Sequence, residues 1–133
     1  MPARLATLDA EGYPDITPLW YLLADGAFVM TSVAGRPHLR HLARDRRAQV
    51  CVDIESGCAV EGQRANTMVR GRGRAEVFPD SGGVWTRRIT LRYIPGDQGR
   101  LQADRRAAMD RYVIRLPPER LIALGTPPSS WPQ

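Results

Sequence analysis

The order of strands and turns ahead of the first helix constrains the fold of this chain most. Alternating and apolar runs predict three strands, at residues 5–8, 16–23 and 27–33. Asp25-Gly26 lies between the last two runs, and Asp-Gly in that setting is a strong signal for a tight antiparallel hairpin. A chain that makes three antiparallel strands before any helix does not follow the strand-helix alternation of a doubly wound sheet.

The rest of the sequence adds strands and a few short helices. We expect strands at 50–54, 67–78, 112–116 and 120–124, and helices at about 37–45, 81–94 and 98–108. Residues 55–66 are glycine-rich and polar, which predicts a loop or a hairpin extension, and the Pro- and Ser-rich tail 125–133 is expected on the surface. The resulting six or seven strands favour a small antiparallel barrel.

The length and composition predict one globular domain, residues 1–133. The chain has 43% apolar and 25% charged residues, and it lacks both an apolar run of roughly 20 residues and a signal-peptide stretch. Cys51 and Cys58 match neither a redox pair nor half of a zinc site, which indicates free thiols in a reducing compartment. We therefore expect a cytoplasmic protein without a membrane partner.

All of the basic residues of the chain are arginines. The net charge is +5, and all 19 basic residues are arginine, a bias typical of a GC-rich genome. An excess of basic residues makes nucleic acid a candidate partner. These arginines, however, are mixed with Asp and Glu along most of the chain. The sequence therefore favours a protein that does not bind nucleic acid.

The end of the third strand runs directly into a cationic helix start. Thr31 and Ser32 close the strand, and Arg36, Pro37 and His38 open the helix, where proline suits the first position. Helix N-termini attract anions through free N–H groups and the macrodipole, and arginine adds bidentate hydrogen bonding. We predict that this segment binds the phosphate of a ligand that lies on the sheet.

Two aromatic residues sit side by side in the second strand. Trp20 and Tyr21 must point to opposite faces of a sheet, so one is expected in the core and the other beside an aromatic ligand. His38 and His41, three apart on the helix, are read as an exposed pair or as ligand contacts; a zinc site lacks further ligands in the sequence. A hydrolytic triad of Ser32, a histidine and Asp45 lacks the Gly-x-Ser-x-Gly context.

The predicted strand 67–78 alternates with a period of two. Arg70, Arg72 and Arg74 share one face, which is either a solvated face or one from which Arg70 reaches a ligand phosphate or a dimer neighbour. Gly71 and Gly73 on the other face let the strand bend or let another backbone approach.

Five segments, taken in order, resemble a known family. They are residues 3–9, Pro18-Leu19-Trp20-Tyr21, residues 31–47, residues 69–77 and Arg92-Tyr93. Together they are similar to the pyridoxamine 5'-phosphate oxidase-like flavin-binding split barrels, which include the actinobacterial deazaflavin-dependent reductases. The resemblance implies a mainly β fold: a six- to seven-stranded antiparallel split β-barrel with two or three short helices.

The resemblance also implies a homodimer with a flavin-type cofactor in each groove between the subunits. The strand at 18–21 is expected beside the cofactor ring, and residues 31–38 on the phosphate side. This chain has His38 where the family commonly has lysine, and His41 where it commonly has asparagine. The cofactor is FMN or the deazaflavin F420, and the lysine-free composition favours F420.

The function that these features favour is an oxidoreductase that transfers hydride to a small organic substrate. The residues expected to bind the cofactor are Pro18, Leu19, Trp20, Thr31, Ser32, Arg36, His38 and Arg70. No catalytic residue and no metal ligand is predicted. The alternatives are a non-enzymatic protein that binds a flavin, a deazaflavin or haem, and a nucleic-acid-binding barrel.

Overall fold

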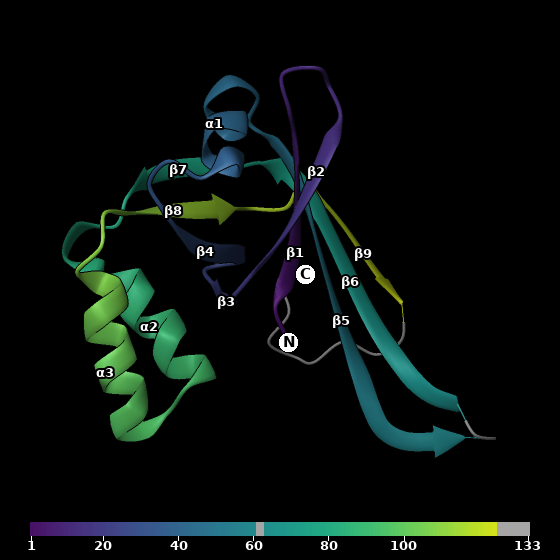
Figure 1. Cartoon of the computed structure of the whole chain (residues 1–133). Coiled ribbons are helices and arrows are strands. Elements are labelled where there is room, and N and C mark those ends of the chain that lie inside the picture. Colours follow the sequence, from purple (N-terminus) through teal and green to yellow (C-terminus); the bar gives the residue numbers. More distant parts are fainter. Residues whose placement is uncertain (61–62, 125–133) are drawn as a thin grey trace.

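The computed structural model describes the backbone of residues 1–60 and 63–124, and the side chains of residues 1–53 and 67–124. Within these residues the chain is mainly β, with nine strands, three α-helices and one 3-10 turn at Ser81–Gly83 (Figure 1). The strands are β1 Ala3–Leu8, β2 Pro14–Leu19, β3 Tyr21–Ala24, β4 Ala27–Val33, β5 Arg47–Val60, β6 Gln63–Arg74, β7 Glu76–Pro79, β8 Arg111–Leu116 and β9 Arg120–Leu124. The helices are α1 Pro37–Arg44, α2 Val84–Tyr93 and α3 Gly96–Ala107.

The strands form two antiparallel sheets. One has the order β2-β1-β5-β6-β9 and the other the order β3-β4-β8-β7, and all described pairings are antiparallel. Because the two sheets do not join into one closed hydrogen-bonded cylinder, the structure confirms the prediction of an antiparallel split barrel.

Two of the predicted strands are each divided between the two sheets. The strand predicted at 16–23 is β2 followed by β3, with Trp20 between them, and the strand predicted at 67–78 is β6 followed by β7, with Ala75 between them. The in-out alternation of side chains continues through both corners, so the sequence pattern does not reveal them. This accounts for two of the strands beyond the predicted six or seven.

The core fills the space between the sheets. Leu5, Val50 and Val69 come from the first sheet and pack with Phe28 and Ile114 from the second; all five are at most 1% exposed. A smaller cluster of Leu22, Val29, Ile89 and Val113 lies on the other side of the second sheet, under α2. The second sheet is therefore covered on both faces, which explains why six consecutive residues of β4 are buried.

Other predicted features lie in residues 55–66, at the start of α2 and at the cysteines. Residues 55–66 are a hairpin extension, because β5 and β6 continue as a ribbon to Val60 and from Gln63 (Figure 1). The N-cap residue of α2 is Gly83, not the expected Asp80 or Ser81, because a 3-10 turn precedes the helix; the carboxylate of Asp80 nevertheless accepts the backbone N–H of Trp85 and of Thr86 in the first turn. No helix in the described ranges combines the length and the apolarity needed to cross a membrane.

Predictions for residues 125–133 and for the side chain of Cys58 lie outside the described residues, whereas Cys51 is a free thiol.

The glycines of β6 lie where the C-terminal segment crosses the strand. A Cβ on Gly73 would be 2.7 Å from the carbonyl oxygen of Pro117 and 3.2 Å from the backbone nitrogen of Glu119. A Cβ on Gly71 would be 2.9 Å from the Phe28 ring. The expectation that another backbone approaches this strand is thus confirmed at Gly73.

We expect Gly73→Ala to lower the free energy of unfolding by about 1–3 kcal/mol, because the methyl group meets backbone atoms that cannot rotate away. This exceeds the roughly 0.4–1 kcal/mol that a less flexible unfolded chain contributes in the opposite direction. Urea unfolding measures the difference. Arg72→Ala, an exposed neighbour, is the control and should stay within about 0.5 kcal/mol of the parent. Equal stability of Gly73→Ala and the parent would contradict the close approach.

Candidate functional site

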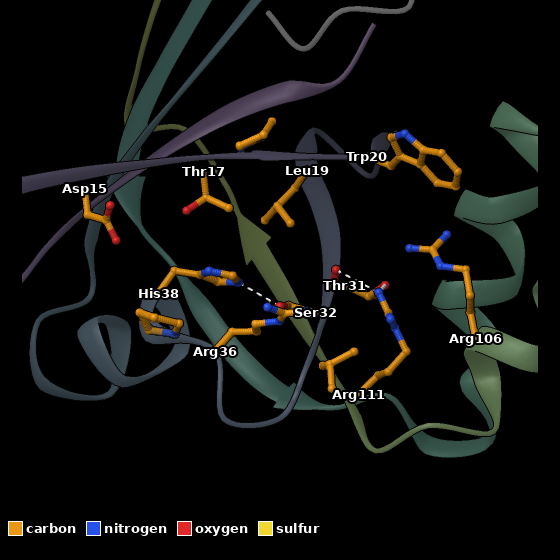
Figure 2. A pocket seen from close by; sticks show the side chains of 13 residues that line it. Asp15, Thr17, Leu19, Trp20, Thr31, Ser32, Arg36, His38, Arg106 and Arg111 are labelled. Atoms are coloured by element: carbon orange, nitrogen blue, oxygen red, sulfur yellow. Dashed lines mark hydrogen bonds between the residues drawn. The ribbon is translucent and has the colours of Figure 1, made fainter.

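A pocket of about 510 Å³ opens where β2, the end of β4, the start of α1, α3 and the start of β8 meet (Figure 2). It is lined by Asp15, Thr17, Pro18, Leu19, Trp20, Thr31, Ser32, Val33, Arg36, Pro37, His38, Arg106 and Arg111. Seven of the eight side chains expected at the cofactor site are among them. The eighth, Arg70, is exposed on β6, opposite Cys51 and Ile122, and its role stays a prediction.

One wall of the pocket is the free edge of β2. Within residues 1–60 and 63–124, this strand is the last in its sheet and pairs only with β1. Successive side chains of a strand point to opposite faces, yet Thr17, Pro18 and Leu19 all line the pocket. The pocket therefore lies against the edge of the strand rather than against one face.

Trp20 stands at the corner where the chain leaves the first sheet for the second. Its ring stacks on Tyr93, with 4.8 Å between the centroids and 5° between the planes, and the guanidinium of Arg106 lies 4.6 Å from its centroid. Tyr21, its neighbour, is 3% exposed and belongs to the core, as expected for one of the two. The contacts with Tyr93 and Arg106 hold the orientation of the Trp20 ring in the pocket wall.

Ser32 and His38 form a buried polar pair. Nε2 of His38 lies 2.7 Å from Oγ of Ser32, and both side chains are 4% exposed. Burial, and after it the charge of Arg36, lowers the pKa of His38 below its usual 6.5, so the imidazole is neutral at pH 7. The interpretation of an exposed histidine pair is therefore wrong for His38, because the core-facing side of α1 is made by this residue and Leu42.

The other groups considered for metal or triad chemistry lie apart. Nδ1 of His41 is 2.9 Å from Oγ1 of Thr7 and 3.7 Å from Oδ2 of Asp15. The Asp45 carboxylate binds Arg47 at 2.7 Å, which lowers its pKa to about 2, so no triad with Ser32 and His38 forms. Among the side chains of residues 1–53 and 67–124, no three His, Cys, Asp or Glu gather as metal ligands would.

Two arginines of the pocket were not predicted from the sequence. Nη2 of Arg111 donates to the carbonyl oxygen and to Oγ1 of Thr31, at 3.2 Å each, and Nη1 of Arg106 donates to Oγ1 of Thr90 at 2.7 Å. Burial lowers the pKa of both, and the neighbouring charge of Arg106 adds to the effect on Arg111, whose pKa falls to about 10. Nε of Arg111 is buried and has no hydrogen-bond partner within the described residues.

A chain of hydrogen bonds fixes Arg111. Oγ1 of Thr86 lies 2.6 Å from Oδ2 of Asp80 and 3.1 Å from Oγ1 of Thr31. The carboxylate can only accept, and a hydroxyl has one hydrogen, so Thr86 donates to Asp80 and receives the hydrogen of Thr31. Thr31 in turn accepts from Arg111. The hydroxyl of Thr31 is therefore hydrogen-bonded within the protein, to Thr86 and to Arg111.

The pocket is strongly cationic. Its lining contains the guanidinium groups of Arg36, Arg106 and Arg111 but a single carboxylate, Asp15. Arg36 also stands at the N-cap position of α1, where the helix dipole adds positive potential. Such an arrangement can hold an anion on one side and place the body of a ligand along β2.

Comparison with protein families gives a match along nearly the whole chain. The family model described as pyridoxamine 5'-phosphate oxidase matches residues 2–124. A search of curated protein sequences gives no significant match.

Several solved structures are similar in fold. A conserved hypothetical protein from Mycobacterium tuberculosis is 21% identical with a TM-score of 0.72, and the match covers 97% of this chain and 86% of the other. A protein named F420 reductase is 19% identical with a TM-score of 0.66, covering 92% and 89%. A heme binding protein from Mycobacterium smegmatis is 27% identical with a TM-score of 0.68; the match covers 94% of this chain but 49% of that protein.

We expect the burial of His38 to make stability depend on pH. The unfolded chain takes up a proton near pH 6.5, whereas the folded chain resists it, so stability is complete above that value and falls as the pH drops toward the lower folded pKa. In urea titrations at about pH 7.5 and about pH 5.5, the parent should lose more unfolding free energy than His38→Gln, whose amide keeps a polar group near Ser32 without titrating. Equal losses in the two proteins would contradict this assignment.

Proposed function

The chain belongs to the pyridoxamine 5'-phosphate oxidase family, and on this premise we propose that it is an oxidoreductase that holds F420 or FMN in the pocket. The observation that carries the proposal is the cationic pocket beside the free edge of β2, at the start of α1. The proposed reaction is hydride transfer to a small organic substrate.

The residues present suit a phosphorylated cofactor. Arg36 at the N-cap of α1 and Ser32 near the end of β4 both line the pocket, where a phosphate would gain charged hydrogen bonds and the field of the helix. The neutral His38 fixes the hydroxyl of Ser32 through their 2.7 Å hydrogen bond.

A bound cofactor of this class would supply the hydride chemistry, and the protein would supply binding, orientation and exclusion of water. Pro18, Leu19 and Trp20 would border the ring and keep solvent from one side of it. Thr31 would act through Arg111, because its hydroxyl is bound within the protein. We assign no protein acid or base, since Nε2 of His38 is already hydrogen-bonded to Ser32.

F420 is the preferred cofactor in this proposal. The similar fold of a protein named F420 reductase supports it, as does the lysine-free composition of the chain. We also propose a cytoplasmic homodimer in which the cofactor lies between the subunits. In such a dimer, Arg70 would reach the pocket of the neighbouring subunit from the exposed face of β6.

A non-enzymatic binding protein is the second candidate. The similarity to a heme binding protein, at 27% identity, favours it. For haem, however, the pocket offers one histidine, His38, and its Nε2 is already hydrogen-bonded to Ser32. A carrier of flavin or deazaflavin therefore suits the pocket better than a haem protein.

We expect the purified protein to bind F420 or FMN, as followed by the visible absorbance and fluorescence of the cofactor. Arg36→Ala should weaken binding by about 1.5–3 kcal/mol, or about 10- to 150-fold, which is the usual contribution of a charged hydrogen bond. Arg44→Ala removes the same charge from the last turn of α1, outside the pocket, and is the matched control. Absence of binding for both cofactors would overturn the proposal.

Turnover separates the enzyme from the carrier. The loaded protein, supplied with reduced cofactor, is offered a panel of quinones, enones and aldehydes. Oxidation of the cofactor above the rate without protein supports the oxidoreductase, and tight binding without turnover across the panel supports the carrier.

A further inference from the structure

Arg106 and Arg111 converge on one end of the pocket. Arg106 comes from the last turn of α3 and Arg111 from the first residue of β8, and both lie toward Trp20, whereas Asp15 and His38 lie at the other side (Figure 2). Arg36 stands at the start of α1, between these two ends of the pocket. The pocket thus has two cationic regions that belong to different elements of the fold.

The two arginines at the Trp20 end form no salt bridge within the described residues. The hydrogen bonds of their guanidinium groups go to threonine oxygens: Arg106 binds Thr90, and Arg111 binds Thr31. The charge of the Asp80 carboxylate acts on Arg111 and offsets part of the repulsion from Arg106, but Asp80 accepts its hydrogen bonds from the backbone of Trp85 and Thr86 and from the Thr86 hydroxyl. In this part of the chain, neither guanidinium group is therefore paired directly with a carboxylate.

Arg111 in particular has the features of a side chain that binds an anionic ligand. The residue is 8% exposed, its Nε is buried without a hydrogen bond, and it lines the pocket. Burying a charged group and leaving a donor unpaired is unfavourable, and a native structure keeps such a group where something else binds it. An anion bound at this end would compensate both guanidinium charges.

One phosphate does not account for all of these groups. The proposed function already assigns the cofactor phosphate to Arg36 and the positive end of α1, which leaves Arg106 and Arg111 without an assigned anion. We propose that Arg106 and Arg111 form a second anion subsite, and that the small organic substrate therefore carries a carboxylate. The proposal rests on the proposed function, because that function assigns the cofactor phosphate to Arg36.

The neighbours of the subsite suit an organic acid. The planar guanidinium edge matches the two oxygens of a carboxylate, and the ring of Trp20 beside Arg106 offers an apolar surface for the rest of the molecule. A substrate anchored in this way would be held at a fixed distance from a ring that lies along β2.

The test compares benzoate with benzamide, which has almost the same shape but no charge. Binding to the purified protein, with and without cofactor, is measured by calorimetry and by tryptophan fluorescence. We expect benzoate to bind at least about 10-fold more tightly than benzamide, as charged hydrogen bonds to two arginines would give. Equal affinity of the two compounds would overturn the proposal.

Matched variants assign the preference to residues. Arg106→Gln, which leaves the buried Arg111 in place, should lose most of the preference for benzoate over benzamide, while its affinity for F420 or FMN should fall much less than that of Arg36→Ala. Arg105→Gln removes an exposed charge from the same turn of α3 and should change neither. Arg111→Lys, which retains the charge but not the fork, should also weaken benzoate.

The outcomes separate this inference from the proposed function. If Arg106→Gln weakens the cofactor as strongly as Arg36→Ala does, the pair serves the cofactor and the subsite for substrate is wrong. If no cofactor binds but benzoate still depends on Arg106, the anion subsite stands and the proposed redox function fails. If benzoate is insensitive to both arginine variants, the subsite proposal fails on its own.

Discussion

The burial of the Arg111 guanidinium is the constraint on which the pocket depends. Taking that charge out of water is tolerated because Thr31 supplies two oxygens, Thr86 receives the hydrogen of Thr31, and Asp80 ends the chain with a carboxylate. The same carboxylate accepts backbone N–H groups in the first turn of α2. One line of polar contacts thus fixes β4, β8 and α2 together, and the cationic end of the pocket is held by regular elements instead of a loop.

Much of the fold could be predicted from the sequence because its signals are local. The Asp25-Gly26 turn and the alternation around Gly71 and Gly73 depend on neighbours along the chain, and the structure confirms both. The sheet corners at Trp20 and Ala75 could not be predicted, because which sheet a strand joins depends on distant partners. Alternation continues through a corner, so the pattern reads as one strand.

The candidate site, like the fold, could be predicted from the sequence only in part. The residues that were predicted and now lie together come from two short segments, 18–20 and 31–38, whose strand-to-helix order is visible in the sequence. Arg106 and Arg111 could not be found, because they stand among other arginines and only tertiary packing separates them from exposed ones such as Arg105. Arg70, predicted to reach a ligand phosphate or a dimer neighbour, lies exposed on β6 outside this pocket.

The two prolines of β2 carry one more consequence. Pro14 and Pro18 have the same parity along the strand, so their backbone groups point to the same side, and at an edge proline is accommodated on the side that faces away from the paired neighbour. The outer side of β2 then presents carbonyl oxygens with Ile16 as its one N–H donor between the prolines. Such an edge cannot template another strand, which protects the chain from sheet-to-sheet aggregation while it keeps a row of acceptors open for a ligand's own N–H groups.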